Sequence, residues 1–183
     1  EYQVKHIAIQ LVQAVAMLEA CAISHRDIKL SNITFPMKIN EELASSSRQA
    51  GGKHQPMQIK LADFGMAGFV EKDGFLRGRC GTPGYVGVCL YTLLCGYEPF
   101  AGDSLEEIIA ANKLSVYDCD TAEWEKVSDD AKDFVQRAMS ATSKNRLTVL
   151  EALAHPWMAQ YGGTINYPPK FKHTKNSKAC VVS

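Results

Sequence analysis

The stretch SHRDIKLSN, residues 24–32, constrains this chain more than any other, because it fixes five polar positions within eight residues. Asp27 can accept a proton from a hydroxyl, Lys29 can neutralise charge on a transferring phosphoryl group, and Asn32 can offer a carbonyl oxygen to a hard cation. The alternative interpretation is a polar loop after a helix, in which the histidine and the arginine satisfy backbone carbonyl groups.

A second motif, DFG at residues 63–65, directly follows the strand-like stretch IKLA. A carboxylate at a strand end, followed by an aromatic anchor and a permissive glycine, suits an ion held over a phosphate. An isolated DFG is more often a bland turn. Downstream of residues 24–32, with GTPGY at residues 81–85 further on, it is far more specific, because the order and context match the protein-kinase signature set.

The chain resembles the C-terminal lobe of a Ser/Thr protein kinase, and the calcium/calmodulin-dependent group is the one that it resembles most. The segments CGTPGYV, LYTLLCGYEPF, VSDDAKDFV and KNRLTVLEALAHPWM occur in the order of that group, from Glu1 to about Met158. The resemblance implies an α+β fold that is mostly helical, the large lobe of a kinase. It also implies an enzyme that transfers the γ-phosphate of ATP to Ser/Thr hydroxyls of protein substrates, with Mg²⁺.

The resemblance assigns roles to five residues. Asp27 is expected to be the catalytic base, and Lys29 to contact the γ-phosphate and to mark Ser/Thr rather than Tyr specificity. Asn32 and Asp63 are expected to hold Mg²⁺ and, with Lys29, to bind ATP. Thr82 is expected to help seat the substrate hydroxyl. Catalysis of this kind rests on positioning and charge neutralisation rather than on covalent chemistry.

The segment between Gly65 and Thr82 contains no Ser, Thr or Tyr, so it offers no acceptor for an activating phosphate. Arg26 pairs with a loop phosphate in many relatives, and we expect it to be a regulatory residue that uses Glu71 or Asp73 instead. The alternative is that these two acids simply face solvent.

Apolar spacing predicts an amphipathic helix at the start of the chain, through Val4, Ile7, Leu11 and Leu18. Residues 33–35 and 59–61 are short strand candidates, which predict one small hairpin. Capping residues predict the starts of three later helices. These are Ser104 with Glu107, Ser128, and Thr148 with Glu151.

Residues 81–95, GTPGYVGVCLYTLLC, run almost at once from a loop-like stretch into an apolar one. In the family, GTPGYV continues into an A-P-E triplet, a variable stretch and D-x-W-S before this helix. We therefore interpret the junction Val86–Gly87 as a deletion relative to the family, which leaves a central helix of about residues 87–95. The missing glutamate pairs in relatives with an arginine at the position of Arg146, so Arg146 is expected to lack its partner.

The chain departs from the family in two further ways: segments of the kinase domain are missing from it, and one loop is longer. These 183 residues contain no Gly-rich loop and no V-A-I-K lysine, so we expect weak Mg·ATP binding and little activity from this chain alone. The alternative function is a catalytically inactive kinase-like lobe that acts as a protein-interaction module. Residues 1–158 are predicted to be a partial kinase domain, in which residues 36–58 are a loop insert or an unspliced intron.

Composition narrows the classes of protein and the cellular locations that suit this chain. A chain that is 46% hydrophobic and 22% charged suits one globular domain with a real core. Lys+Arg and Asp+Glu are both 20, so the zero formal charge gives no argument for a nucleic-acid partner. The six cysteines form no C-x-x-C pair, which favours a reducing, cytoplasmic location over a disulfide framework.

Residues 159–183 are predicted to be a flexible basic tail. Its last four residues, CVVS, fit a C-a-a-X prenylation box at Cys180, and nearby lysines would add an electrostatic signal. If the box is used, the protein sits on the cytoplasmic face of a membrane; the alternative is a chance cysteine near the terminus. The tail shows no calmodulin-binding helix or EF-hand loop, so calmodulin is not supported as a partner.

Overall fold

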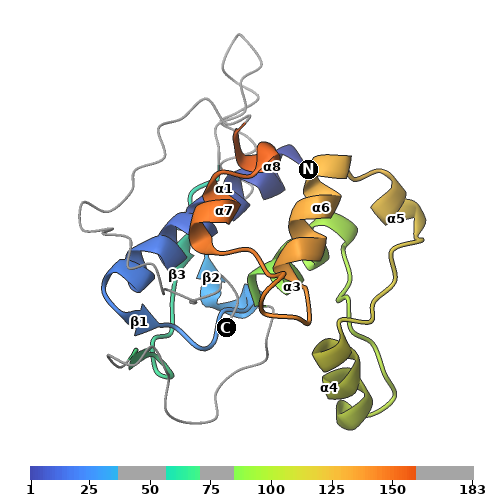
Figure 1. Ribbon diagram of the computed structural model, residues 1–183, viewed down its shortest axis with the longest axis horizontal. Coiled ribbons are helices and arrows are strands. Elements are labelled where there is room, and N and C mark those ends of the chain that lie inside the picture. The colour runs from blue at the N-terminus through green and yellow to red at the C-terminus, as the bar shows by residue number, and fades with distance from the viewer. Residues whose placement is uncertain (37–56, 71–84, 160–183) are drawn as a thin grey trace.

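The computed structural model describes residues 1–36, 57–70 and 85–159 (Figure 1). The predictions for Thr82, Cys180, Glu71 and Asp73 lie outside these residues. So do most of the proposed insert over residues 36–58 and the tail beyond residue 159, and the domain boundaries predicted there stay predictions.

The described chain is mostly helical, with four very short strands, which confirms the predicted fold class. The elements follow in the order α1 (Tyr2–Ala20), β1 (Ile23–Ser24), the 3₁₀ helix η1 (Leu30–Asn32), β2 (Ile33–Thr34), β3 (Lys60–Leu61), β4 (Gly68–Phe69), α3 (Tyr85–Cys95), α4 (Leu105–Leu114), α5 (Ala122–Glu125), α6 (Asp129–Ala138), α7 (Val149–Leu153) and α8 (Pro156–Ala159). Among the described helices, none combines the length and the apolar character needed to cross a membrane.

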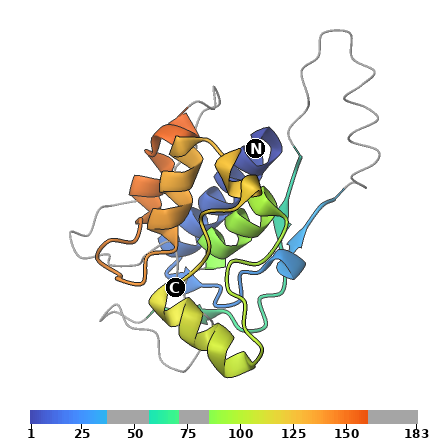
Figure 2. The same cartoon turned by 90° about the vertical axis from the view of Figure 1, so that its right-hand side faces the viewer.

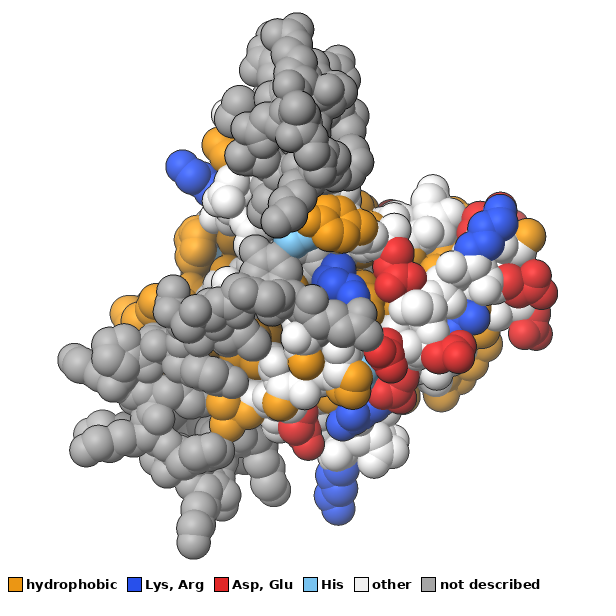
Figure 3. Space-filling model, turned by 90° about the horizontal axis from the view of Figure 1, so that it is seen from above, with side chains coloured by type: hydrophobic (Ala, Val, Ile, Leu, Met, Phe, Trp, Pro, Cys, Tyr) orange, Lys and Arg blue, Asp and Glu red, His pale blue; other side chains and the backbone are white. Residues whose placement is uncertain are grey.

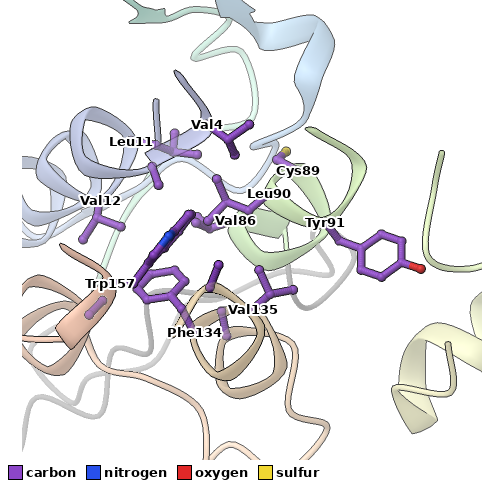
Figure 4. Close-up of a cluster of buried hydrophobic side chains, with 14 of the residues drawn as sticks. Val4, Leu11, Val12, Val86, Cys89, Leu90, Tyr91, Phe134, Val135 and Trp157 are labelled. Carbon is purple, nitrogen blue, oxygen red and sulfur yellow. The ribbon is translucent and has the colours of Figure 1, made fainter. Parts of the chain in front are cut away.

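Helix α1 forms one wall of the core, as its apolar spacing predicts. Its Val4, Ile7 and Leu11 side chains are buried, and the helix packs against α3, α7 and α8. In Figure 4, Leu11 from α1 lies in the same cluster as Phe134 from α6 and Trp157 from α8. Burial of each large apolar side chain contributes about 1.5–3 kcal/mol, so this cluster is what holds the helices together.

Helix α3 begins at Tyr85, two residues before the predicted start, and the junction Val86–Gly87 therefore lies inside a helix. Val86 is fully buried. A Cβ atom on Gly87 would lie 2.5 Å from Cγ of Met139 and 3.2 Å from Cβ of Ala138. Glycine thus lets α3 approach α6 closely. Both residues are buried in the core, and the helix runs unbroken through the junction.

The strands form two separate antiparallel pairs. Strands β2 and β3 pair as predicted, with Ile33 opposite Leu61. Strands β1 and β4 also pair, with Ile23 opposite Phe69, and this pairing was not predicted. Strands of two residues are too short for an alternating pattern to show in the sequence, so only their contacts reveal them.

The helix caps agree with the sequence except in one detail. Thr148 and Glu151 form a full capping box, in which the Glu151 N–H donates to Thr148 Oγ1 at 3.2 Å and the Thr148 N–H donates to Glu151 Oε2 at 2.8 Å. Ser104 Oγ accepts from the Glu107 N–H at 3.3 Å, but the Glu107 carboxylate accepts from the Asp103 N–H. The reciprocal bond predicted at Ser104 is therefore displaced by one residue.

Glu1 joins the start of α1 to α6 and α8. Its carboxylate accepts hydrogen bonds from the Ser128 N–H at 2.9 Å, the Ser128 hydroxyl at 2.7 Å and the Trp157 indole N–H at 3.1 Å. Burial opposes ionisation of Glu1, but the three hydrogen bonds outweigh it and lower the pKa of this carboxyl.

We expect acid to weaken this junction. Because the pKa of Glu1 is lower in the folded than in the unfolded chain, its contribution to stability is fully present above the unfolded value, about 4.3, and is lost as the pH falls through the folded pKa. Below that pH, the urea concentration at the midpoint of unfolding should therefore fall more steeply with falling pH for wild type than for Glu1→Gln. The exposed Glu106→Gln is the matched control, and equal pH slopes for wild type and Glu1→Gln would contradict the assignment.

Candidate active site

An apolar anchor holds the loop between β1 and β2. Ile28 is buried, whereas its neighbours Asp27 and Lys29 are half-buried and exposed, respectively. The loop then passes through η1 into β2, where Ile33 is again buried. Two isoleucines in the core therefore fix the backbone from which the polar side chains of SHRDIKLSN project.

Asp27 lies at the centre of the polar contacts. Lys29 Nζ is 2.8 Å from Asp27 Oδ2. Asn32 Nδ2 donates to Asp27 Oδ2 at 3.0 Å and to the Asp27 backbone oxygen at 2.8 Å. The structure thus brings together three residues that the sequence singled out. Because the amide nitrogen of Asn32 faces Asp27, its Oδ1 faces away, and no described residue donates a hydrogen bond to it.

This ion pair shifts the pKa values of both partners. The hydrogen bond from Lys29 lowers the pKa of the Asp27 carboxyl; burial opposes this, and the Asn32 bond adds to it. The hydrogen bond to Asp27 raises the pKa of Lys29. Burial opposes this rise, and attraction to the carboxylates of Asp27 and Asp63 adds to it. Both groups are therefore charged at neutral pH, and Asp27 is available as a hydrogen-bond acceptor for a hydroxyl.

His25 ties this loop to the segment before Asp63. The ring is buried, with 2% of its surface exposed. Its Nδ1 accepts from the Asp27 N–H at 3.3 Å, so Nε2 carries the proton and donates to the Ala62 backbone oxygen at 3.1 Å. The ring also lies 4.6 Å, centroid to centroid, from Phe64. His25 therefore positions Asp27 relative to the DFG motif, a role that the sequence interpretation did not assign to it.

Asp63 follows β3 in a left-handed conformation with φ of 59°, which is uncommon outside glycine. Its Oδ1 accepts from the Gly65 N–H at 3.1 Å. The Ala62 N–H donates to the Asn32 backbone oxygen at 2.8 Å, so Asp63 begins beside the loop that carries Asn32. A strained backbone of this kind costs on the order of 1–3 kcal/mol and is typical of functional sites.

Arg26 reaches over the residues that follow DFG. It also has a left-handed backbone, with φ of 66°, and its Nε donates to the Met66 oxygen at 2.5 Å. Gly68 leaves room for the guanidinium, because a Cβ there would lie 2.7 Å from Arg26 Nη2. Both interpretations of SHRDIKLSN therefore hold, for different residues: His25 and Arg26 satisfy carbonyl groups, while Asp27 and its partners face one another.

The family follows from a comparison of the whole chain. The family model for the protein kinase domain matches residues 1–87 and 86–158. The chain belongs to the protein kinase family. The two matched segments of the kinase domain meet at Val86 and Gly87, which is where the sequence predicts a deletion relative to the family.

Individual kinases agree with this assignment. The chain is 33% identical over 189 residues to calcium-dependent protein kinase 3 of Plasmodium yoelii yoelii, covering 93% of this chain and 32% of that protein. It is 29% identical over 178 residues to calcium/calmodulin-dependent protein kinase type 1 of Caenorhabditis elegans, covering 87% of this chain and 47% of that protein. The chain thus spans about a third to a half of the length of these relatives, whose names support the predicted kinase group.

The expectation that Arg146 lacks a partner in this kinase lobe is wrong. Its Nε donates to the Ser140 oxygen at 2.9 Å, and Nη2 donates to the Ala141 oxygen at 3.3 Å. Carbonyl groups just after α6 have no intrahelical partner, and a guanidinium with five donors readily satisfies them. The prediction failed because it considered only a carboxylate as the partner for the arginine.

Asn32 and Asp63 fit the magnesium role that the kinase resemblance implies. Amide and carboxylate oxygens are the hard ligands that Mg²⁺ prefers, and Mg²⁺ usually takes only one or two carboxylates, with phosphates and water completing its shell. Within the described ranges, no three His, Cys, Asp or Glu side chains gather as a metal cluster.

Proposed function

We propose that this lobe is part of a kinase domain that transfers the γ-phosphate of ATP to Ser or Thr hydroxyls of protein substrates. The observation that carries the proposal is the contact set of Asp27, Lys29 and Asn32, with Asp63 held beside it by the β2–β3 pair. The family as a whole uses ATP and Mg²⁺, and the oxygen ligands of the site suit that ion.

Each residue would act by charge and position. The Asp27 carboxylate would accept the hydrogen bond, and then the proton, of the attacking hydroxyl. Lys29, half of whose side chain is exposed, can turn its ammonium from Asp27 toward a phosphoryl oxygen. Asn32 and Asp63 would hold Mg²⁺, which when bound neutralises phosphate charge. His25 would keep Asp27 and the DFG motif in register through its two hydrogen bonds.

Three of the predicted roles rest on the sequence alone. Thr82 as a substrate-positioning residue and Cys180 as a lipid attachment site lie outside the described residues. A regulatory role for Arg26 through Glu71 or Asp73 depends on residues that are likewise outside them. Membrane association and a cytoplasmic location therefore stay predictions, as does the absence of a calmodulin site.

The test is transfer of radiolabelled γ-phosphate to a Ser/Thr peptide by protein expressed from the full transcript. We expect Mg²⁺-dependent transfer that Asp63→Asn removes, because the metal loses a charged ligand. The 183-residue chain alone is expected to bind Mg·ATP only weakly by calorimetry. A full-transcript product that binds Mg·ATP but never transfers phosphate would overturn the proposal.

A kinase-like interaction module is the second candidate, and one observation favours it. Val86 and Gly87 lie inside α3 and pack in the core, so the chain forms its central helix without the A-P-E to D-x-W-S block. A verified transcript that joins these two residues directly would support this candidate, and recovery of the block would support the enzyme.

A further inference from the structure

Helix α4 lies at the edge of the molecule, below the body in both Figure 1 and Figure 2. Ile108 and Ala111 pack its inner side against the core. Its outer side exposes Leu105 and Ile109, which are one turn apart and are 72% and 42% exposed. Residues four apart in a helix are neighbours, so these two side chains form one apolar strip on the surface.

The strip leads to a cavity at the C-terminal end of α4. Lys113, one further turn along the same face, lines this cavity of about 90 Å³, together with Asn112 and Arg146. Phe100 and Met139 supply its apolar walls. The cavity therefore combines an apolar lining with two cationic side chains, directly beside an exposed apolar strip.

Asn112, which lines the cavity, carries a buried polar atom without a hydrogen-bond partner among the described residues. The residue is about nine-tenths buried, with 9% exposed, and the atom is its Oδ1. A buried polar atom without a partner costs about 1–3 kcal/mol. A carboxylate can accept a hydrogen bond from an amide nitrogen but not from an amide oxygen, so an acidic occupant would pair with Nδ2 of Asn112.

The two ends of α4 carry opposite charge. Asp103, Glu106 and Glu107 stand exposed at its N-terminal end, whereas the cavity end has Lys113 and Arg146. The helix has 10 residues, so the two ends are about 15 Å apart at 1.5 Å per residue. On the face seen in Figure 3, acidic and basic side chains are interspersed. On α4 the two signs of charge are separated between its ends, which would give a partner a defined orientation.

We propose that the α4 strip, defined as Leu105, Ile109 and Lys113 with the adjoining cavity, docks an extended segment of a partner protein. An acidic side chain of that segment enters the cavity beside Lys113 and Arg146. Two apolar side chains lie on Leu105 and Ile109, and a basic residue about five positions from the acid faces the acidic end, since an extended chain rises about 3.3 Å per residue. This docking does not require phosphoryl transfer.

The probe is a fluorescein-labelled peptide with blocked ends, Glu-Ala-Leu-Ala-Leu-Lys-Lys, titrated with the 183-residue chain in low salt. We expect fluorescence anisotropy to show saturable binding that weakens at least tenfold in Leu105→Ser and in Lys113→Glu. Both side chains are exposed, so neither variant should disturb the fold, and circular dichroism checks this. A peptide with its two leucines replaced by serine should bind at least tenfold more weakly.

The matched control is Leu114→Ser. Leu114 is 69% exposed on the same helix but faces away from the strip, so its loss should leave binding unchanged. Three results would overturn the proposal: no saturable binding, equal loss in Leu105→Ser and Leu114→Ser, or sedimentation showing that the strip pairs two copies of this chain instead. Because no ATP is present, failure here would leave the kinase proposal untouched.

Discussion

Asp27→Asn is expected to lower the rate of phosphoryl transfer by about 10²–10⁴-fold, the usual contribution of a positioned general base. Asparagine keeps the size of the side chain and can still meet the Asn32 amide, but it cannot accept the hydroxyl proton. It also removes the 2.8 Å ion pair with Lys29. Nucleotide affinity should change little, because Asp27 serves the acceptor rather than ATP.

The measurement compares turnover with Mg·ATP affinity in protein from the full transcript. Asp129→Asn is the matched control, since Asp129 is a fully exposed aspartate 4.0 Å from Lys132 on α6 and takes no part in the site. Unchanged turnover in Asp27→Asn would remove Asp27 from the role of base. A parallel loss of ATP affinity would indicate a nucleotide-binding role instead.

Gly87→Val is expected to unfold the chain or to lower its stability by at least about 3 kcal/mol, at the upper end of overpacking penalties. A first side-chain atom at this position already meets Met139 and Ala138 of the facing segment at 2.5 and 3.2 Å. Valine adds two more carbons in the same space. Because α3 and α6 form the most extensive helix contact in the described chain, separating them exposes the centre of the core. A domain has only about 5–15 kcal/mol of net stability to lose.

The direction of the stability change in the smaller substitution Gly87→Ala distinguishes an effect of packing from an effect of helix propensity. In an exposed helix, Gly→Ala gains up to about 1 kcal/mol, whereas Gly87→Ala should destabilise here. Met139→Ala removes the nearest atom, so it should cost less in the Gly87→Ala background than alone, with a coupling of about 0.5–3 kcal/mol. Urea unfolding measures all four proteins, and the exposed Ala110→Val is the control. Additive effects would show that Gly87 does not pack against Met139.

The family and the order of the main helices could be predicted from the sequence. SHRDIKLSN and DFG are local patterns whose residue types already carry their chemistry, so Asp27, Lys29, Asn32 and Asp63 could be named without a structure. The long helix at the start, the β2–β3 pair and the capping box of Thr148 were also predictable. Their signals lie within a few residues of one another in the chain.

The contacts between distant segments could not be predicted and depend on the folded arrangement. His25 meets Ala62 across 37 positions, and Glu1 meets Trp157 across 156. Neither partner carries a local signal for the other. The start of α3 at Tyr85 and the carbonyl partners of Arg146 likewise depend on which surfaces pack together. Hydrogen bonds and close packing depend on which atoms meet in space. A pattern of neighbouring residues in the sequence does not show which distant residues will meet.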